Sequence, residues 1–329
     1  MSDVPRMIPS TSMPTARITA AGAGSGPFSL ADETAYRAWR AARLDAAPKQ
    51  ADDLIIPVAD LAQPTESELA ALRAMVRRAN MAVYRSPALA GHAESARRAL
   101  ARFAQIAGLT EFEEHRSSGP DGIVPIEVVE EGLRAGFIPF SNRAINWHTD
   151  GYYNYRGPDR CIRSMALHCV RSAAAGGESG LFDPEIAYIR LRDRNPDYIR
   201  ALMHPEAMTI PAHEEATVSA HGAVAGPVFV AHPTTGALIM RFTIRKRNVT
   251  WRDDPVLAAA LEALADILAN DPLVYRLRLE PGMGVICNNV LHDRRAFDNA
   301  AADTADGGRL LFRIRSYNAV FETGRPARH

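Results

Sequence analysis

The stretch WHTDG at residues 147–151 decides the fold, because it sets an imidazole, His148, and a carboxylate, Asp150, two positions apart. Residues two apart on an extended strand point to the same face, so both side chains can contact one ion where the strand ends. A second imidazole, His292, lies far along the chain in the stretch VLHDR at 290–294, just after a β-like run. Two histidines and one carboxylate are the set that holds Fe(II) in non-haem oxygenases. These three residues are therefore the predicted metal ligands.

The distance along the chain between these ligands favours a fold that lays sequence-distant strands side by side. An HxD triplet alone is weak evidence, because a chain with ten histidines contains one by chance fairly often. The predicted strands are short, are separated by turn signals, and span residues 123–130, 164–170, 227–230, 237–242, 273–279, 285–290 and 310–320. This pattern is typical of a sandwich or jelly roll and not of alternating βαβ units. The predicted fold class is mainly β with α elaborations: a double-stranded β-helix (jelly roll) with flanking helices.

Helical periodicity is concentrated near the N-terminus. Apolar spacing and N-cap signals predict helices at 29–46, 65–79 and 93–107, and two later ones that begin at Asp183-Pro184 and Asp254-Pro255. Residues 1–28, rich in Pro, Ser, Ala and Gly, are expected to form a flexible arm. We therefore expect a single domain over 29–329. It would consist of a helical elaboration at 29–110 and a jelly-roll core at 111–320.

Composition excludes several classes of partner. The chain has 329 residues, of which 47% are hydrophobic, and its 38 basic and 38 acidic residues give no net charge. Nothing in this balance indicates a nucleic-acid partner, and no apolar run is long enough to predict a membrane span. The three cysteines are widely separated and form neither a metal motif nor a disulfide framework. A reducing, cytoplasmic location is the expectation.

The stretch RLLFRIR at 309–315 is the second candidate for chemistry. On a strand, Arg309 and Arg313 point to one face while Leu310, Phe312 and Ile314 point to the other. A guanidinium inside a barrel mouth can bind a carboxylate through two parallel hydrogen bonds. The alternative is the solvated basic face of an edge strand.

The stretch GGES at 176–179 is a tight turn that leads into a strand. Its hydroxyl, on Ser179, can donate to an anion beside the arginines. The alternative is an ordinary hairpin turn without a ligand.

These stretches resemble, in order, the motifs of the taurine dioxygenase-like (TauD/TfdA) family of Fe(II)/2-oxoglutarate-dependent dioxygenases. WHTDG resembles the family's proximal HxD motif and GGES its GG(D/E)T turn. The stretch HPTTG at 232–236 is similar to its HP…TG hairpin, LHDRRAF at 291–297 to its LHxRxxF motif, and RLLFR at 309–313 to its RxLxR motif. The resemblance extends from about residue 146 to 317, roughly half the chain.

The resemblance implies a set of roles. His148, Asp150 and His292 would hold Fe(II), and Arg309 with Ser179 would bind the distal carboxylate of 2-oxoglutarate. Arg313 would face the primary substrate or assist with the same carboxylate, so the choice of main anchor between the two arginines stays open. Together with O2, this set would hydroxylate or oxidatively cleave a small organic substrate and release succinate and CO2. Family members are often dimers or tetramers, so a homodimer or a homotetramer is an open expectation.

Aromatic residues cluster around the first ligands. Trp147, Tyr152 and Tyr153 are candidate substrate-pocket walls, although packing roles are the simpler reading. Arg313 favours an anionic substrate. Two alternatives remain for the whole chain: a cupin-like metalloprotein without 2-oxoglutarate chemistry, and a non-catalytic jelly-roll binding protein.

Overall fold

The structure is a computed structural model that describes residues 25–113, 118–132, 134–212, 222–245, 249–299 and 308–322. Residues 1–24 of the expected N-terminal arm lie outside the described residues.

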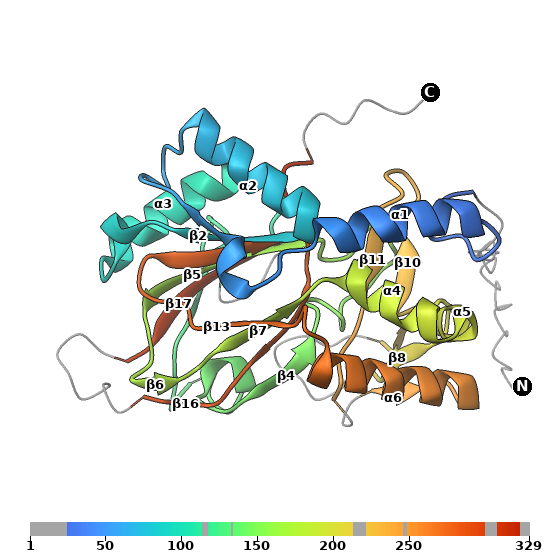
Figure 1. The fold of residues 1–329 in the computed structure, drawn as a ribbon. Coiled ribbons are helices and arrows are strands. Elements are labelled where there is room, and N and C mark those ends of the chain that lie inside the picture. The colour runs from blue at the N-terminus through green and yellow to red at the C-terminus, as the bar shows by residue number, and fades with distance from the viewer. Residues whose placement is uncertain are drawn as a thin grey trace, which may run out of the picture.

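Two facing β-sheets form the centre of the molecule (Figure 1). The six-stranded main sheet has the order β1 (Ile55–Pro57), β2 (Met81–Arg85), β14 (Met283–Cys287), β5 (Ser164–Arg171), β17 (Leu310–Ser316) and β3 (Val124–Ile126). The four-stranded minor sheet has the order β13 (Tyr275–Leu277), β7 (Ser179–Phe182), β15 (Leu291–Arg294) and β4 (Ile145–His148). Side chains of both sheets line one cavity between them. This arrangement confirms the predicted jelly roll with flanking helices.

Helices flank the two sheets. They are α1 (Glu33–Ala46), α2 (Glu66–Ala79), α3 (Ala93–Ile106), α4 (Pro184–Arg194), α5 (Pro196–Leu202) and α6 (Pro255–Asn270). The remaining short strands are β6 (Ala175–Gly176), β8 (Met208–Ile210), β9 (Val224–Gly226), β10 (Phe229–Ala231), β11 (Leu238–Met240), β12 (Thr250–Trp251) and β16 (Phe297–Asp298). Each predicted helix is present, and Thr65 closes the capping box with Glu68 that the sequence indicated.

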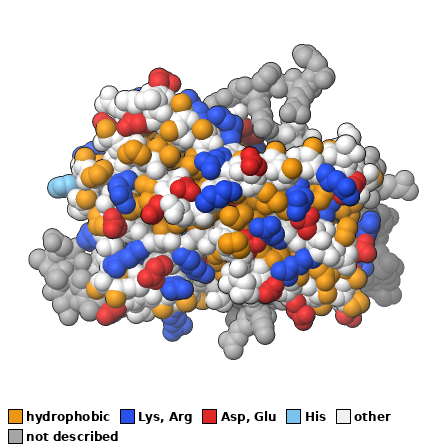
Figure 2. Space-filling model, viewed as in Figure 1, with side chains coloured by type: hydrophobic (Ala, Val, Ile, Leu, Met, Phe, Trp, Pro, Cys, Tyr) orange, Lys and Arg blue, Asp and Glu red, His pale blue; other side chains and the backbone are white. Residues whose placement is uncertain are grey.

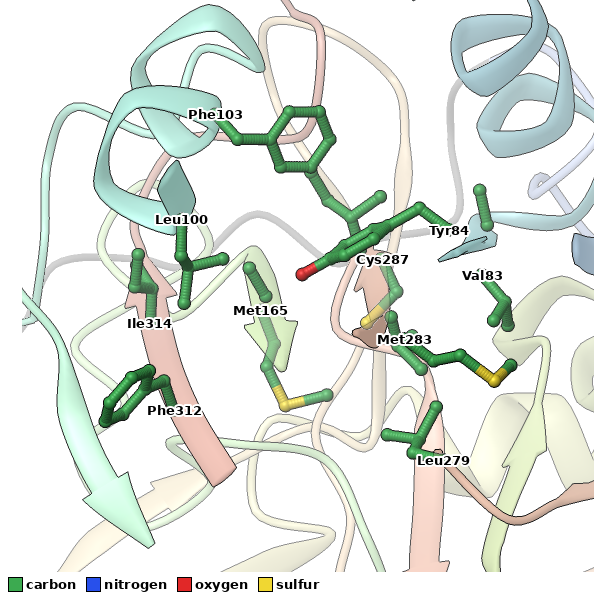
Figure 3. Close-up of a cluster of buried hydrophobic side chains, with 14 of the residues drawn as sticks. Val83, Tyr84, Leu100, Phe103, Met165, Leu279, Met283, Cys287, Phe312 and Ile314 are labelled. Atoms are coloured by element: carbon green, nitrogen blue, oxygen red, sulfur yellow. The ribbon is translucent and has the colours of Figure 1, made fainter. Parts of the chain in front are cut away.

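The outer face of the main sheet is covered by α2 and α3, and this packing forms the first hydrophobic cluster. Figure 3 shows Leu100 and Phe103 of α3 beside sheet residues such as Tyr84 and Ile314. The rings of Tyr84 and Phe103 meet edge to face, with centroids 5.3 Å apart. A second cluster gathers the buried faces of α4, α5 and α6 with β8, β10 and the end of the minor sheet. These clusters hold the sheets and their cavity in place.

Within the main sheet, a glycine creates the space for a buried aromatic residue. Gly284 of β14 lies between Tyr84 and His168 on the neighbouring strands, and the Tyr84 hydroxyl is 3.0 Å from Nδ1 of His168. A Cβ at Gly284 would overlap the hydroxyl end of the Tyr84 ring and would lie 2.5 Å from the carbonyl oxygen of Leu167. The missing side chain therefore lets Tyr84 reach across the strand.

We expect Gly284→Ala to lower the free energy of unfolding by about 1–3 kcal/mol, because the tightly packed sheet has no room for the added methyl group. Urea denaturation of the variant measures this loss. Gly222→Ala is the matched control, since a Cβ there has nothing within 4 Å. Equal stability of the two variants would contradict the packing described for Tyr84.

Buried His168 makes the stability of the fold depend on pH. Burial lowers its pKa to about 4, so the folded protein keeps the imidazole neutral. As the pH falls below the ordinary histidine pKa near 6.5, this imidazole binds a proton in the unfolded chain but stays neutral in the folded chain. The contribution of neutral His168 to the free energy of unfolding is therefore fully present above about pH 6.5. It falls by up to about 1.4 kcal/mol per unit as the pH drops toward 4.

The measurement is urea denaturation of wild type and His168→Gln at several pH values between 7 and 5. Wild type is expected to lose stability more steeply than the variant, in which this group cannot titrate. Parallel curves would show that His168 carries no such linkage.

One expected strand is wrong in its extent. The run 285–290 was predicted as a single strand ending just before His292, but β14 ends at Cys287 and His292 lies in a separate strand, β15, of the other sheet. Asn289 lies between them with a φ of +46°. This left-handed conformation, which asparagine tolerates, turns the chain from one sheet to the other.

Two further observations concern the surface charges and the helices. Figure 2 shows Lys and Arg side chains interspersed with Asp and Glu over the face in view. Within the part of the chain that the structure describes, no helix is both long and apolar enough to cross a membrane.

Candidate metal centre

The three predicted ligands meet at one end of the minor sheet. Strands β4 and β15 are antiparallel neighbours, and their register sets His148 directly opposite His292. Asp150 follows β4 by two residues. One ligand atom from each of the three side chains lies within 4.8 Å of the others, and the two imidazole centroids are 4.2 Å apart. The fold therefore brings together residues that are far apart in the sequence.

Both imidazoles are held in an orientation that suits a metal. Nδ1 of His148 donates to the carbonyl oxygen of Asn146 at 2.9 Å, and Nδ1 of His292 donates to that of Val290 at 2.9 Å. These bonds fix the tautomer and leave each Nε2 lone pair free for coordination. Burial, followed by the neighbouring His292, lowers the pKa of His148 to about 3, so this ring is neutral at physiological pH.

Asp150 supplies the anionic ligand. Burial alone would raise its pKa, but the guanidinium of Arg315, followed by that of Arg313, brings the pKa below its ordinary value. Oδ1 lies 3.3 Å from Nη1 of Arg315 and 3.9 Å from Nη1 of Arg313. Oδ2 is buried and has no hydrogen-bond partner among the described residues. A buried carboxylate oxygen without a partner beside two free imidazole nitrogens fits a divalent iron.

Asn289 clamps the backbone that carries Asp150. Its Oδ1 accepts from the N–H of Asp150 at 2.7 Å, and its Nδ2 donates to the carbonyl oxygens of Asp150 and Ile162 at 3.0 and 2.8 Å. The turn that carries His292 into the minor sheet thereby also fixes the carboxylate ligand. The role of Asn289 could not be predicted from the pair NN at 288–289, because hydrogen bonds between a side chain and a distant segment leave no periodic signal in the sequence.

Arg315 is a second functional residue that sequence reasoning missed. Its guanidinium bridges Asp150 and Glu113, and Glu113 in turn accepts a hydrogen bond from Nδ2 of Asn154 at 2.7 Å. Burial alone would lower its pKa, but Tyr153, Asp150 and Glu113 raise it, so Arg315 remains charged. The alternation in RLLFRIR was the available signal, because it sets Arg315 on the same face as Arg309 and Arg313.

A cavity of about 80 Å³ opens beside the ligands, between the two sheets. His148 and His292 line it, together with all three residues predicted to bind the co-substrate: Ser179, Arg309 and Arg313. Apolar walls come from both sheets: Ile126, Met165, Leu167, Val285 and Leu311 from the main sheet, and Ile145 and Leu181 from the minor sheet. The predicted arginine face of β17 is therefore an inner face and not a solvated edge.

Two buried guanidiniums at one end of this cavity have no carboxylate partner in the described part of the chain. Arg309 and Arg294 lie 4.9 and 4.8 Å from the centroid of the Phe297 ring. Burial lowers the pKa of Arg309 to about 10, and burial with the charge of Arg309 lowers that of Arg294 to about 9. Arg294 donates to backbone carbonyls, including that of Ser141 at 2.7 Å. Such an excess of buried positive charge favours an anionic ligand.

The GGES turn packs directly behind Arg309. Gly176 has a φ of +72°, and a Cβ there would lie 2.5 Å from the carbonyl oxygen of Ala296. A Cβ at Gly177 would lie 3.3 Å from Cβ of Phe297 and 3.6 Å from Nε of Arg309. The glycines allow this close approach, and the chain then enters β7 with Ser179 buried at the cavity.

The structure separates the three predicted aromatic residues. The Tyr152 ring lies perpendicular to that of His148, with centroids 6.4 Å apart, and Tyr153 lies beneath the guanidinium of Arg315 at 6.0 Å. Trp147 points away from the ligands, because it occupies the opposite face of β4 and packs in the second hydrophobic cluster. The structure therefore does not bring Trp147 together with the site.

Comparison with known proteins agrees with this geometry. The family model described as "Taurine catabolism dioxygenase TauD, TfdA family" matches residues 44–315. A uridine-5'-phosphate dioxygenase from Amycolatopsis sp is 33% identical over 177 residues, which cover 51% of this chain and 58% of that protein. The alignment thus spans little more than half the length of this relative.

Solved structures show the same fold. The non-heme iron oxygenase OrfP, in complex with Fe and alpha-ketoglutaric acid, has a TM-score of 0.55 at 16% identity. The match covers 78% of this chain and 82% of OrfP. An asparagine oxygenase in complex with Fe(II), 2S,3S-3-hydroxyasparagine and succinate has a TM-score of 0.53 at 15% identity, covering 78% and 87% of the two chains. At such identities the likeness concerns the fold.

The family match covers most of the chain and includes every predicted ligand and both predicted anchor arginines. It confirms the resemblance inferred from the five ordered motifs. The chain belongs to the TauD/TfdA dioxygenase family.

Proposed function

We propose that this protein is an Fe(II)- and 2-oxoglutarate-dependent dioxygenase that oxidises a small organic substrate. One observation supports this most strongly: a His-Asp-His set with free ligand atoms opens onto a cavity whose far end holds buried guanidiniums without a carboxylate partner among the described residues. A metal at one end and positive charge at the other match a co-substrate that has a keto acid at one end and a carboxylate at the other.

His148, Asp150 and His292 would hold the iron. Arg315 keeps the Asp150 carboxylate ionised, and Asn289 holds its backbone in register with His292. Bound Fe(II), 2-oxoglutarate and O2 would supply the oxidative decarboxylation to succinate and CO2 and the oxidation of a substrate C–H bond. The protein fixes the geometry of the ligands and keeps water away through the apolar cavity walls.

Arg309, with Ser179, would bind the distal carboxylate. Arg309 has no carboxylate partner among the described residues, whereas Arg313 is already 3.9 Å from Asp150. This difference favours Arg309 as the main anchor and leaves Arg313 between the anchor and the metal ligands. Arg294, whose guanidinium also lies over the Phe297 ring, adds positive potential at the same end.

The primary substrate would be a small anion. The relative from Amycolatopsis sp is named for uridine-5'-phosphate, which makes this nucleotide the first compound to test. The product would be a hydroxylated compound or the result of an oxidative cleavage. We further propose a cytoplasmic single-domain enzyme, over residues 29–329, that works as a homodimer or a homotetramer.

The test is succinate release by purified protein supplied with Fe(II), 2-oxoglutarate and O2, with and without uridine-5'-phosphate. We expect slow succinate formation without substrate, faster formation with a true substrate, and none after iron chelation. Iron binding without any succinate would favour the cupin-like alternative. Failure to bind iron at all would favour a non-catalytic binding protein.

A further inference from the structure

Arg245 lies on the same face of the minor sheet as the metal ligands. Residues 242–245 run antiparallel beside β4: His148 pairs with Thr243, and the N–H of Ile244 donates to the carbonyl oxygen of Trp147 at 3.1 Å. Cross-strand partners share a face and side chains alternate along a strand. Thr243 and Arg245 therefore share the face of His148, while Phe242 and Ile244 pack with Trp147 in the second cluster.

The charge of Arg245 is not balanced within the described part of the chain. The residue is half-buried. Its backbone N–H bonds to Thr243, yet its side chain has no hydrogen bond or ion pair within the described ranges. By contrast, Arg315 is paired with Glu113 and Asp150. A partly desolvated cation without a counter-ion costs free energy that an anionic ligand can recover.

Arg245 also lies on a different side of the metal centre from the co-substrate anchor. β4 is the last strand of the minor sheet, and the 242–245 segment extends that sheet beyond it, on the side away from β15. Arg309, by contrast, lies at the cavity end that holds Phe297 and the GGES turn. The two positive groups are therefore placed to receive two different anions.

We propose that Arg245 binds the anionic group, a phosphate in the first instance, of the primary substrate. This inference rests on the proposed function, because it assigns the substrate side of the same site. A guanidinium presents parallel N–H donors that match two phosphate oxygens. The Tyr152 ring, beside His148, offers a flat surface for the remainder of the substrate. Arg245 thus becomes the residue that selects phosphorylated over neutral compounds.

The experiment compares uridine-5'-phosphate with uridine, which differ only in the charged group. Calorimetry is carried out without oxygen on protein already loaded with Fe(II) and 2-oxoglutarate. We expect wild type to bind the nucleotide about 10- to 100-fold more tightly than uridine, the effect of one charge-assisted contact. Arg245→Gln should lose this preference with uridine affinity unchanged, and Arg245→Lys should keep part of it.

Arg252→Gln is the matched control, because Arg252 is a surface residue paired with Asp254 at the start of α6. It should retain the full preference for the nucleotide. The proposal is overturned if Arg245→Gln keeps that preference, or if it weakens both ligands equally and lowers the melting temperature, which would show a structural role. It is also overturned if loaded wild type does not distinguish the nucleotide from uridine. Loading with Fe(II) and 2-oxoglutarate is measured first, so failure of the proposed function is seen separately.

Discussion

Replacing His292 with alanine is expected to lower turnover by about three orders of magnitude or more while the fold is kept. His292 is half-buried and lines the cavity, and its loss removes one of three metal ligands without opening the hydrophobic clusters. Without a firmly held metal, the variant lacks both the Lewis acid and the centre that orients the co-substrate, so little turnover remains. Succinate release under saturating Fe(II) and 2-oxoglutarate measures the effect. His148→Ala and Asp150→Ala should behave in the same way.

His92→Ala is the control for this series, because His92 is exposed and makes no side-chain capping bond at the start of α3. It should leave succinate release unchanged. The circular dichroism spectra of all variants should overlay that of wild type. Near-normal turnover by His292→Ala would remove this histidine from the metal site.

Arg309→Ala is expected to raise the concentration of 2-oxoglutarate needed for half-maximal rate by about 30- to 700-fold. The estimate corresponds to the loss of a charge-assisted bidentate contact, about 2–4 kcal/mol. Arg309→Lys should have an intermediate effect, since an ammonium keeps the charge but not the paired geometry. The rate at saturating co-substrate should change much less than the half-saturation concentration does.

Arg85→Ala is the matched control: Arg85 is an exposed arginine of the same sheet, 3.8 Å from Glu280. It should leave the 2-oxoglutarate requirement unchanged. Arg313→Ala separates the two candidate anchors. If that variant raises the requirement while Arg309→Ala does not, the assignments of Arg309 and Arg313 are reversed.

Alternation along strands made much of the site predictable from the sequence. HxD and RxxxR are spacings that put two side chains on one face of an extended strand. The structure places Arg309 and Arg313 on the cavity face of β17. The same alternation places Arg315 on this face, where its guanidinium contacts the metal ligand Asp150, although Arg315 belongs to none of the motifs. Asp150 lies in the turn that follows β4, where its carboxylate meets His148 and His292. Local rules therefore identify which side chains can act together once the face is known.

Other features depend on tertiary contacts that no local pattern encodes. The turn at Asn288-Asn289, which moves the chain between sheets, looked like the end of one continuous strand. Glu113 reaches Arg315 from a loop about 200 residues earlier in the chain. Trp147 follows the alternation rule too, but the sequence did not reveal which face of β4 would meet the second cluster.

The central claim is that His148, Asp150 and His292 hold one iron that 2-oxoglutarate chelates. An anaerobic absorption titration tests it most directly. Wild type should develop the weak visible charge-transfer band of an Fe(II)–2-oxoglutarate complex only when both are present, saturating at one iron per chain, and His292→Ala should not develop it. Absence of the band in wild type, or its persistence at full strength in His292→Ala, would contradict this account.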